Sequence, residues 1–146
     1  MKRLLIKLIS RIFLFPAWFM PFSKLRVFFH RLRGVKIGKG TDIGYFVIID
    51  HNYPDMVSIG KGCGIACKTT ILAHDEVFTY IDKKYKQRLA PVKIGNNCCA
   101  GTGSVFLPGS EIGDQSIAGA NAVVTKRFPK KVVIAGIPAK IIKTIK

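Results

Sequence analysis

The sequence predicts an all-β core wound as a parallel β-helix, with a basic α-helical segment before it. Two observations carry this prediction. An aliphatic residue returns every six positions over most of the stretch from Ile37 to Thr125, and a small residue follows it four positions later. A period of six matches neither an α-helix nor a single strand. It matches a chain that makes one short strand and one corner every six residues, so that three sides close a coil of about eighteen residues.

The first element is a basic amphipathic segment, residues 1–33, which holds eight Lys or Arg and no acid. Its longest uncharged apolar run has eleven residues, fewer than the roughly twenty that a membrane-spanning helix needs. Arg3, Lys7 and Arg11 form one polar stripe of a helix that Pro16 should kink or end. We expect this helix to lie on an anionic membrane surface. The alternative, which is compatible with it, is that the segment only covers the open end of the column.

A second helix is expected within this segment, with Ser23 as its N-cap and Gly34 as its stop signal. The large apolar residues between these two positions recur at helical spacing, and the basic residues occupy the remaining positions. The expected apolar face comprises Leu25, Phe28, Phe29 and Leu32.

The β-helix itself is assigned to residues 34–146. The period breaks twice: the spacing is ten between Ile49 and Ile59, and twenty-three between Ile71 and Ile94. Because coils must stay in register to stack, the extra residues should leave the column as loops. The larger loop is placed at 75–91 and a C-terminal cap at 127–146. The residues in phase are Ile37, Ile43, Ile49, Ile59, Ile65, Ile71, Ile94, Ala100, Phe106, Ile112, Ala118 and Val124.

Charge and cysteine content narrow the class of protein. The net charge is +16, and both chain ends are rich in Lys and Arg and free of acids, which indicates an anionic partner surface. A hydrophobic content of 49% excludes a disordered chain. Cys63 and Cys98 occupy the small-residue position of the repeat, and Cys67 and Cys99 lack metal-site spacing, so all four are interpreted as thiols of a reducing cytoplasm.

Two C-terminal stretches carry a family resemblance: A-G-A-N-A-V-V-T-K at 118–126 and A-G-I-P-A-K at 135–140. With the repeat, they resemble the hexapeptide-repeat acyltransferases, near the maltose/galactoside acetyltransferase and polysaccharide O-acetyltransferase branches. The resemblance spans about residues 34–146. It implies a left-handed β-helix, a homotrimer, and acetyl-CoA bound as co-substrate in a groove between neighbouring subunits, without a metal.

The resemblance also implies a catalytic histidine just before the large loop, where this chain has His74. A neutral imidazole can remove the proton of a sugar hydroxyl as that hydroxyl attacks a thioester, and no covalent enzyme intermediate is then required. His51 is the rival: it either lines the acceptor pocket or lies in a simple turn. Asp50 and Asp75 are weaker candidates for contacts with the acceptor, and either Asp75 or Glu76 is a candidate for orienting the His74 ring.

The same resemblance assigns a set of residues to coenzyme A. Small residues in closely spaced coils can offer backbone partners to the pantetheine arm, and Lys can neutralise the phosphates. Two departures are Cys99, where the family often has an aromatic residue, and Asn121, which replaces a turn glycine but tolerates left-handed backbone. The cofactor-binding candidates are Gly101, Thr102, Gly119, Ala120, Thr125, Lys126, Lys140 and Lys143.

The resulting interpretation is an acetyl-CoA-dependent O-acetyltransferase of a sugar or glycan precursor. We expect a cytoplasmic enzyme that is peripheral on the inner membrane face. A γ-type carbonic anhydrase, which shares the fold, would need three zinc-binding histidines, and His30 lies outside the column. A basic scaffold or nucleic-acid-binding protein is the non-enzymatic alternative that the charge allows, but the sequence shows no aromatic and basic strand motif of an RNA-binding sheet, so we expect no nucleic-acid partner.

Overall fold

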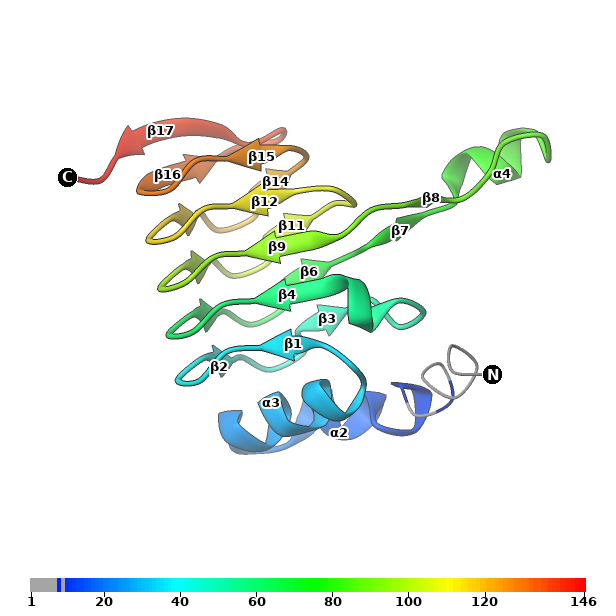
Figure 1. The fold of residues 1–146 in the computed structure, drawn as a ribbon, viewed down its shortest axis with the longest axis horizontal. Helices are drawn as coiled ribbons and strands as arrows, with labels where there is room; N and C mark the ends of the chain where they lie inside the picture. Colours follow the sequence, from blue (N-terminus) through cyan, green and yellow to red (C-terminus); the bar gives the residue numbers. More distant parts are fainter. Residues whose placement is uncertain (1–7, 9) are drawn as a thin grey trace.

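The computed structural model describes residues 8 and 10–146, and shows a three-sided column of short parallel strands that stands on two helices (Figure 1). Each side of the column is one sheet. Side A has the strand order β1-β4-β9-β12-β15, side B has β17-β16-β13-β10-β5-β2, and side C has β14-β11-β6-β3. The strands of side A are β1 (Lys36–Ile37), β4 (Val57–Ile59), β9 (Val92–Ile94), β12 (Glu111–Ile112) and β15 (Arg127–Phe128).

The other two sides repeat the same arrangement. Side B comprises β2 (Asp42–Ile43), β5 (Gly64–Ile65), β10 (Cys99–Ala100), β13 (Ile117–Ala118), β16 (Val132–Ala135) and β17 (Lys140–Thr144). Side C comprises β3 (Ile48–Ile49), β6 (Thr70–Ile71), β11 (Val105–Phe106) and β14 (Val123–Val124). Over residues 34–135, the chain completes four coils and begins a fifth, so the winding extends past residue 127, where the C-terminal cap was placed. After β16 the chain folds back, and β17 pairs antiparallel with β16.

Three corners join the sides, and we name them by the sides they connect. The AB corner comprises 38–41, 60–63, 95–98 and 113–116, and the BC corner comprises 44–47, 66–69, 101–104 and 119–122. The CA corner comprises 50–56, 72–91, 107–110 and 125–126, and includes both breaks in the period. The left-handed backbone expected at Asn121 is confirmed by its φ of 56°.

The core consists of ladders of the in-phase residues. On side C, Ile49 pairs with Ile71, Ile71 with Phe106, and Phe106 with Val124. All four are fully buried, and the small residues four positions after the leads are buried at the corners. The prediction that the period of six packs one residue inward per side is therefore confirmed.

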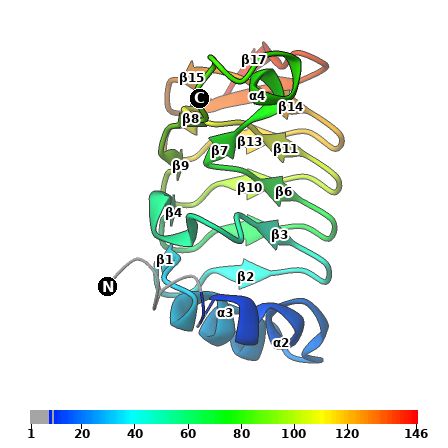
Figure 2. The same cartoon turned by 90° about the vertical axis from the view of Figure 1, so that its right-hand side faces the viewer.

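The large break forms an arm on the CA corner. The strands β7 (His74–Asp75) and β8 (Arg88–Leu89) pair antiparallel and lead to a short helix, α4 (Val77–Ile81). The arm projects away from the column (Figures 1 and 2), and Tyr80 at its tip is 83% exposed. The smaller break contains the 3-10 helix η1 (Pro54–Met56).

The N-terminal segment forms α2 (Leu14–Phe19) and α3 (Ser23–Leu32), which lie across the base of the column (Figures 1 and 2). The helical turn before α2 is interrupted at Phe13, and Pro16 falls in the first turn of α2, where its missing N–H costs nothing. Gly34, with φ of 105°, ends α3 as predicted. The prediction of Ser23 as N-cap is wrong: the cap is Phe22, and the Ser23 hydroxyl donates to Asp42 instead.

The burial of α3 also differs from the prediction. Arg26, His30 and Arg33 are buried against the column, whereas Phe28 is 52% exposed. The hydrogen bonds between coils explain why basic residues of this segment are buried while apolar ones are exposed. The N–H groups of each coil donate to carbonyls of the next coil, as Ile48 does to Thr69, so the first coil has carbonyls with no coil beneath them.

Two arginines of α3 and its C-cap residue Arg33 satisfy these carbonyls, one for each side of the column. The Arg31 side chain donates to the carbonyls of Ile37 and Gly38 on side A, and Arg26 Nε donates to Ile43 on side B. On side C, Arg33 donates to the carbonyls of Ile49 and Asp50. Because the first coil needs donors, α3 is oriented with these basic side chains toward the column. Its apolar residues consequently face outward.

Candidate active site

His74 and Asp50 lie on the CA corner in successive coils and contact each other directly. The His74 Nδ1 atom is 2.5 Å from Asp50 Oδ2, and the His74 side chain is 10% exposed. The ring centres of His51 and Tyr53 lie 5.6 and 5.5 Å from that of His74. The corner therefore brings together one carboxylate, two imidazoles and one phenol.

The Asp50 carboxylate is fully buried and saturated with donors. Its Oδ1 accepts from the backbone N–H groups of Asn52 and Tyr53, both at 2.9 Å, and its Oδ2 accepts from those of Ala73 and His74. Burial acts to raise the pKa of Asp50, but the hydrogen bonds from His74, Tyr53 and Ala73 outweigh burial and hold this pKa below its ordinary value. Asp50 is thus a carboxylate that accepts from His74 Nδ1–H, which leaves Nε2 of the imidazole as the proton acceptor.

This arrangement revises the assignments made from sequence. Asp50 has no face open to an acceptor, because protein donors occupy both oxygens. The residue that orients the His74 ring is Asp50, whereas Asp75 accepts from the backbone N–H of Val77 at the start of the arm. His51 is exposed beside His74. A carboxylate at the end of the aliphatic run V-I-I-D was the one available signal for the role of Asp50.

His30 lies outside this cluster, on α3. It is fully buried in α3, with its Nδ1 2.9 Å from a guanidinium nitrogen of Arg33. Burial, followed by the charges of Arg33 and Arg26, lowers the pKa of His30 to about 3, so the ring is neutral at pH 7. Within residues 8 and 10–146, no three His, Cys, Asp or Glu side chains gather in a group that could hold a metal ion.

The cofactor-binding candidates fall on two corners. Thr125 and Lys126 are exposed on the CA corner, two strand spacings from His74, or about 10 Å. The other corner candidates are separated from His74 by the width of side C, on the order of 15 Å. These are Gly101, Thr102, Gly119 and Ala120, on the BC corner. Lys140 and Lys143 are exposed on β17, where they pair with Ala135 and Val133.

The packing of the coils requires a glycine at position 101, independently of any cofactor. A Cβ atom built on Gly101 would lie 2.5 Å from the backbone nitrogen of Ala120 in the next coil. The close stacking of coils therefore already requires glycine here, whatever this corner binds.

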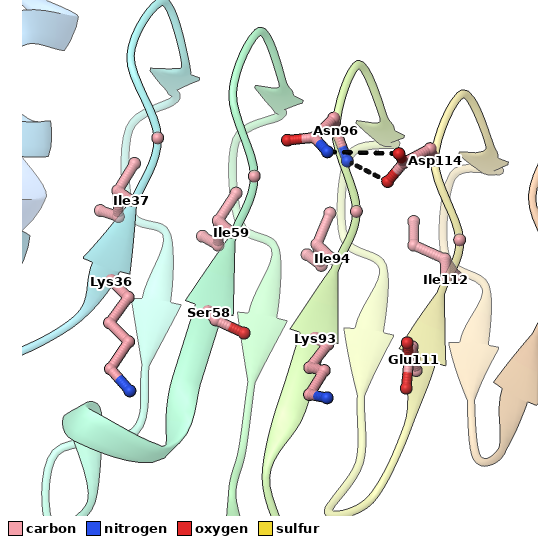
Figure 3. A pocket seen from close by; sticks show the side chains of 14 residues that line it. Lys36, Ile37, Ser58, Ile59, Lys93, Ile94, Asn96, Glu111, Ile112 and Asp114 are labelled. Atoms are coloured by element: carbon pink, nitrogen blue, oxygen red, sulfur yellow. Dashed lines mark hydrogen bonds between the residues drawn. The ribbon is translucent and has the colours of Figure 1, made fainter.

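The outward surfaces of the sides differ in chemistry. Figure 3 shows side A, where Lys36, Ser58, Lys93 and Glu111 project from successive strands and Asn96 bonds to Asp114 at the corner. A shallow groove of about 520 Å³ crosses this side and contains none of the predicted site residues. Side C is largely apolar instead. Its outward residues are Ile48, Thr70, Val105 and Val123.

Comparison with known proteins identifies the family. No protein-family model matches the chain. The chain is 34% identical over 130 residues to the putative acetyltransferase YvoF of Bacillus subtilis, covering 88% of this chain and 72% of the relative. It is 33% identical over 130 residues to the galactoside O-acetyltransferase of Escherichia coli, but spans only 61% of that relative's length.

Solved structures agree on the fold. A hexapeptide-repeat acetyltransferase from Vibrio cholerae superimposes with a TM-score of 0.83 at 18% identity, covering 100% of this chain and 94% of the other. A galactoside acetyltransferase in complex with coenzyme A gives a TM-score of 0.68 at 23% identity, covering 99% and 81%. The column, its corners and these relatives define a left-handed β-helix acetyltransferase. The chain belongs to the hexapeptide-repeat acetyltransferases, the superfamily that the sequence motifs predicted.

Proposed function

We propose that this chain is an O-acetyltransferase that transfers the acetyl group of acetyl-CoA to a hydroxyl of a sugar or glycan precursor. The observation that carries the proposal is the buried Asp50 carboxylate that holds the His74 ring at the edge of the column. Two relatives support the substrates: a galactoside O-acetyltransferase at 33% identity, and a solved structure of such an enzyme with coenzyme A.

In the proposed reaction, the acceptor hydroxyl gives its proton to His74 Nε2 as its oxygen attacks the thioester carbonyl carbon. The C–O bond forms first, and collapse of the tetrahedral intermediate breaks the C–S bond. The imidazolium then returns the proton to the departing thiolate, so that the enzyme ends neutral at this ring. General-base assistance of this kind contributes roughly 10²–10⁴ in rate.

Asp50 supports this base in two ways. Its hydrogen bond fixes the tautomer that carries the proton on Nδ1, and its charge stabilises the imidazolium that forms during the reaction. The carboxylate stays ionised because its pKa is held below the ordinary value. His51 and Asp75, at the mouth of the arm, are proposed to contact the acceptor.

We assign the cofactor to a seam between copies of the chain. His74 and the candidates Thr102 and Ala120 lie on opposite edges of side C, so one copy alone offers them no shared cleft. A neighbouring copy that packs beside side C can bring its BC corner to the first copy's CA corner, and the apolar outward row of that side favours such packing. A ring of such contacts that closes after three copies gives the homotrimer that the family resemblance implies. Lys126, Lys140 and Lys143 are assigned to the phosphates.

We propose that the protein binds a membrane surface, because the helices at the foot of the column expose their apolar side chains. The outward surface of α2, α3 and the turn before them presents large apolar side chains without an acid, since the first acid in the chain is Asp42. Arg11, Lys24 and Lys39 are exposed around it. Within residues 8 and 10–32, the apolar surface comprises Leu8, Ile12, Phe15, Phe19, Phe22, Leu25, Phe28 and Leu32, each at least 39% exposed.

A flat apolar surface with a basic rim fits the interface of a bilayer that contains anionic lipids. No helix among residues 8 and 10–146 is long and apolar enough to cross a membrane. The strands β3 and β6, which precede Asp50 and His74, are the first two of side C above the helices. One helix diameter plus one to two strand spacings would place the His74 imidazole roughly 15–20 Å from the lipid surface. That height suits an acceptor sugar carried on a membrane lipid.

The transfer proposal is tested by thiol release from acetyl-CoA against a panel of sugars, nucleotide sugars and lipid-linked glycans. His74→Gln should abolish release with the best acceptor while the oligomer stays intact. His51→Gln is the matched control, and retained activity in His74→Gln with loss in His51→Gln would move the base to His51. Lys126→Glu should raise the KM for acetyl-CoA and leave that for the acceptor unchanged.

The membrane proposal is tested by sedimentation with vesicles of phosphatidylcholine, with and without phosphatidylglycerol. Wild type should pellet with the anionic vesicles, and a Phe22→Ser, Phe28→Ser double variant should bind on the order of a hundredfold more weakly. Tyr80→Ser, on the arm, is the control and should bind normally. Equal pelleting of the double variant would reject this surface as a membrane-binding site. The membrane proposal would also be rejected if wild type formed a larger oligomer without lipid and the double substitution dissociated it.

A further inference from the structure

Arg33 lies behind the Asp50–His74 pair and is the largest of the fully buried side chains. Its guanidinium donates to the carbonyls of Ile49 and Asp50 at 2.8 and 3.1 Å, and its Nε contacts Ser10 at 3.2 Å. The remaining contact is with His30 Nδ1 at 2.9 Å. Within residues 8 and 10–146, the hydrogen-bond partners of this cation are therefore uncharged atoms.

The chain segment that carries Asp50 is held from below over three consecutive carbonyls. Arg33 binds those of Ile49 and Asp50, and the buried Ser10 hydroxyl donates to that of His51 at 3.0 Å. From above, the backbone N–H of Asp50 donates to Ile71. The position of the Asp50 carboxylate thus depends on side chains of the helical base as well as on the next coil.

Arg33, Asp50 and His74 follow one another in space, with Asp50 in contact with both the guanidinium and the imidazole. Burial lowers the pKa of Arg33 to about 10, with Asp50 acting to raise it, so the guanidinium stays charged at neutral pH. Asp50 is its buried counter-charge and also bonds to His74. Among the described residues, the groups that face His74 are Asp50, His51 and Tyr53, and the neutral His30 is packed beside Arg33.

We propose that Arg33 is a positioning residue for His74, because it fixes the turn that carries Asp50, and Asp50 in turn orients the His74 ring. This inference rests on the proposed function, in which His74 is the base. The helical base is then part of the catalytic apparatus as well as a cover for the column. Arg26 and Arg31 do the same capping on sides B and A, where no site residue depends on the capped carbonyls.

The test reads His74 directly, without a known acceptor. The chain has three histidines, so ring nitrogen resonances in ¹⁵N-histidine-labelled protein can be assigned with His30→Gln and His51→Gln. Arg33→Met, Arg33→Lys and the matched control Arg26→Met are compared with wild type by the tautomer that these resonances report at pH 7. Turnover is measured with methyl galactoside and with the best acceptor of the thiol-release panel.

In wild type, His74 should carry its proton on Nδ1. Arg33→Met removes the two hydrogen bonds that fix the turn carrying Asp50, so the Nδ1–H and Nε2–H tautomers of His74 should mix. With either acceptor, kcat should fall about 10²-fold at unchanged KM for acetyl-CoA, the scale of a misplaced catalytic group. Arg33→Lys keeps the charge but not the two-carbonyl geometry, so it should also lose the single tautomer of His74. Arg26→Met should change neither.

A single Nδ1–H tautomer of His74 and full kcat in Arg33→Met would overturn the proposal. If Arg33→Met does not fold, Arg33→Lys provides the test. A single Nδ1–H tautomer and full kcat in Arg33→Lys would overturn the proposal. Equal changes in Arg26→Met would show a general effect of capping and would also overturn it. Full activity of His74→Gln would instead defeat the proposed function, while the resonances would still report whether Arg33 controls His74.

Discussion

Replacement of Asp50 by Asn is the most informative single change, because it removes a charge without changing shape. The carboxylate accepts two backbone N–H groups on Oδ1, and two more plus His74 Nδ1 on Oδ2. An amide has one oxygen, so in either orientation its NH₂ group faces two buried N–H donors. Each buried donor left without an acceptor costs about 1–3 kcal/mol, which predicts a loss of about 2–6 kcal/mol.

The same substitution should remove catalysis for a separate reason. With its oxygen toward Asn52 and Tyr53, the new amide donates to His74 Nδ1 and places the imidazole proton on Nε2. The ring then has no free acceptor for the hydroxyl proton, and kcat should fall about 10²–10⁴-fold.

Urea unfolding at pH 7 measures the first effect and thiol release from acetyl-CoA the second. Asp114→Asn is the control, because that carboxylate also accepts a backbone N–H, from Asn96 at 2.7 Å, but on the exposed AB corner. It should leave activity unchanged and stability nearly so. An Asp50→Asn enzyme within about 1 kcal/mol and threefold of wild type would refute the assignment of the buried acceptor.

Three further changes test the column and its base. Phe106→Ala, at a fully buried site on side C, should cost about 3–5 kcal/mol in urea unfolding, and a smaller cost would show a loosely packed core. Gly38→Ala should lower the melting temperature, since its Cβ would lie 2.4 Å from the backbone nitrogen of Lys61, whereas Gly64→Ala meets nothing within 4 Å and should not. His30 is buried with a depressed pKa, so the unfolded chain binds its proton first and stability should fall by roughly 1.4 kcal/mol per unit as pH drops from about 6.5. His30→Gln should remove that slope, and an unchanged slope would contradict the neutral burial.

The sequence predicts the column well because its period is a local property. Each in-phase residue, such as Phe106, must point inward if the coils close at six residues per side, and each following small residue must fill a corner. The arm was located for the same reason, since a gap of twenty-three residues cannot stay in register. His74 was found at the edge of that gap.

The Asp50–His74 contact was not predicted because both residues lie where the period fails. Across the CA corner, the spacing is ten in one coil and twenty-three in the next, so the repeat gives no register for the corner residues. The orientation of α3 was missed for a different reason. Its apolar periodicity predicts that Phe28 faces inward, but the first coil needs hydrogen-bond donors more than it needs apolar cover.

The location of the site next to the base follows from the cost of burying a carboxylate. An inner coil cannot hold one easily, because its backbone groups are already paired with the coils above and below. The first coil has free carbonyls, and these draw buried guanidinium groups such as Arg33 into the base. A cation is then present within the protein, next to the turn of Asp50, and it offsets the burial of the charge that His74 requires. The unpaired end of the β-helix, which is a liability for stability, therefore supplies the electrostatic setting in which a neutral imidazole can be held ready beside a carboxylate.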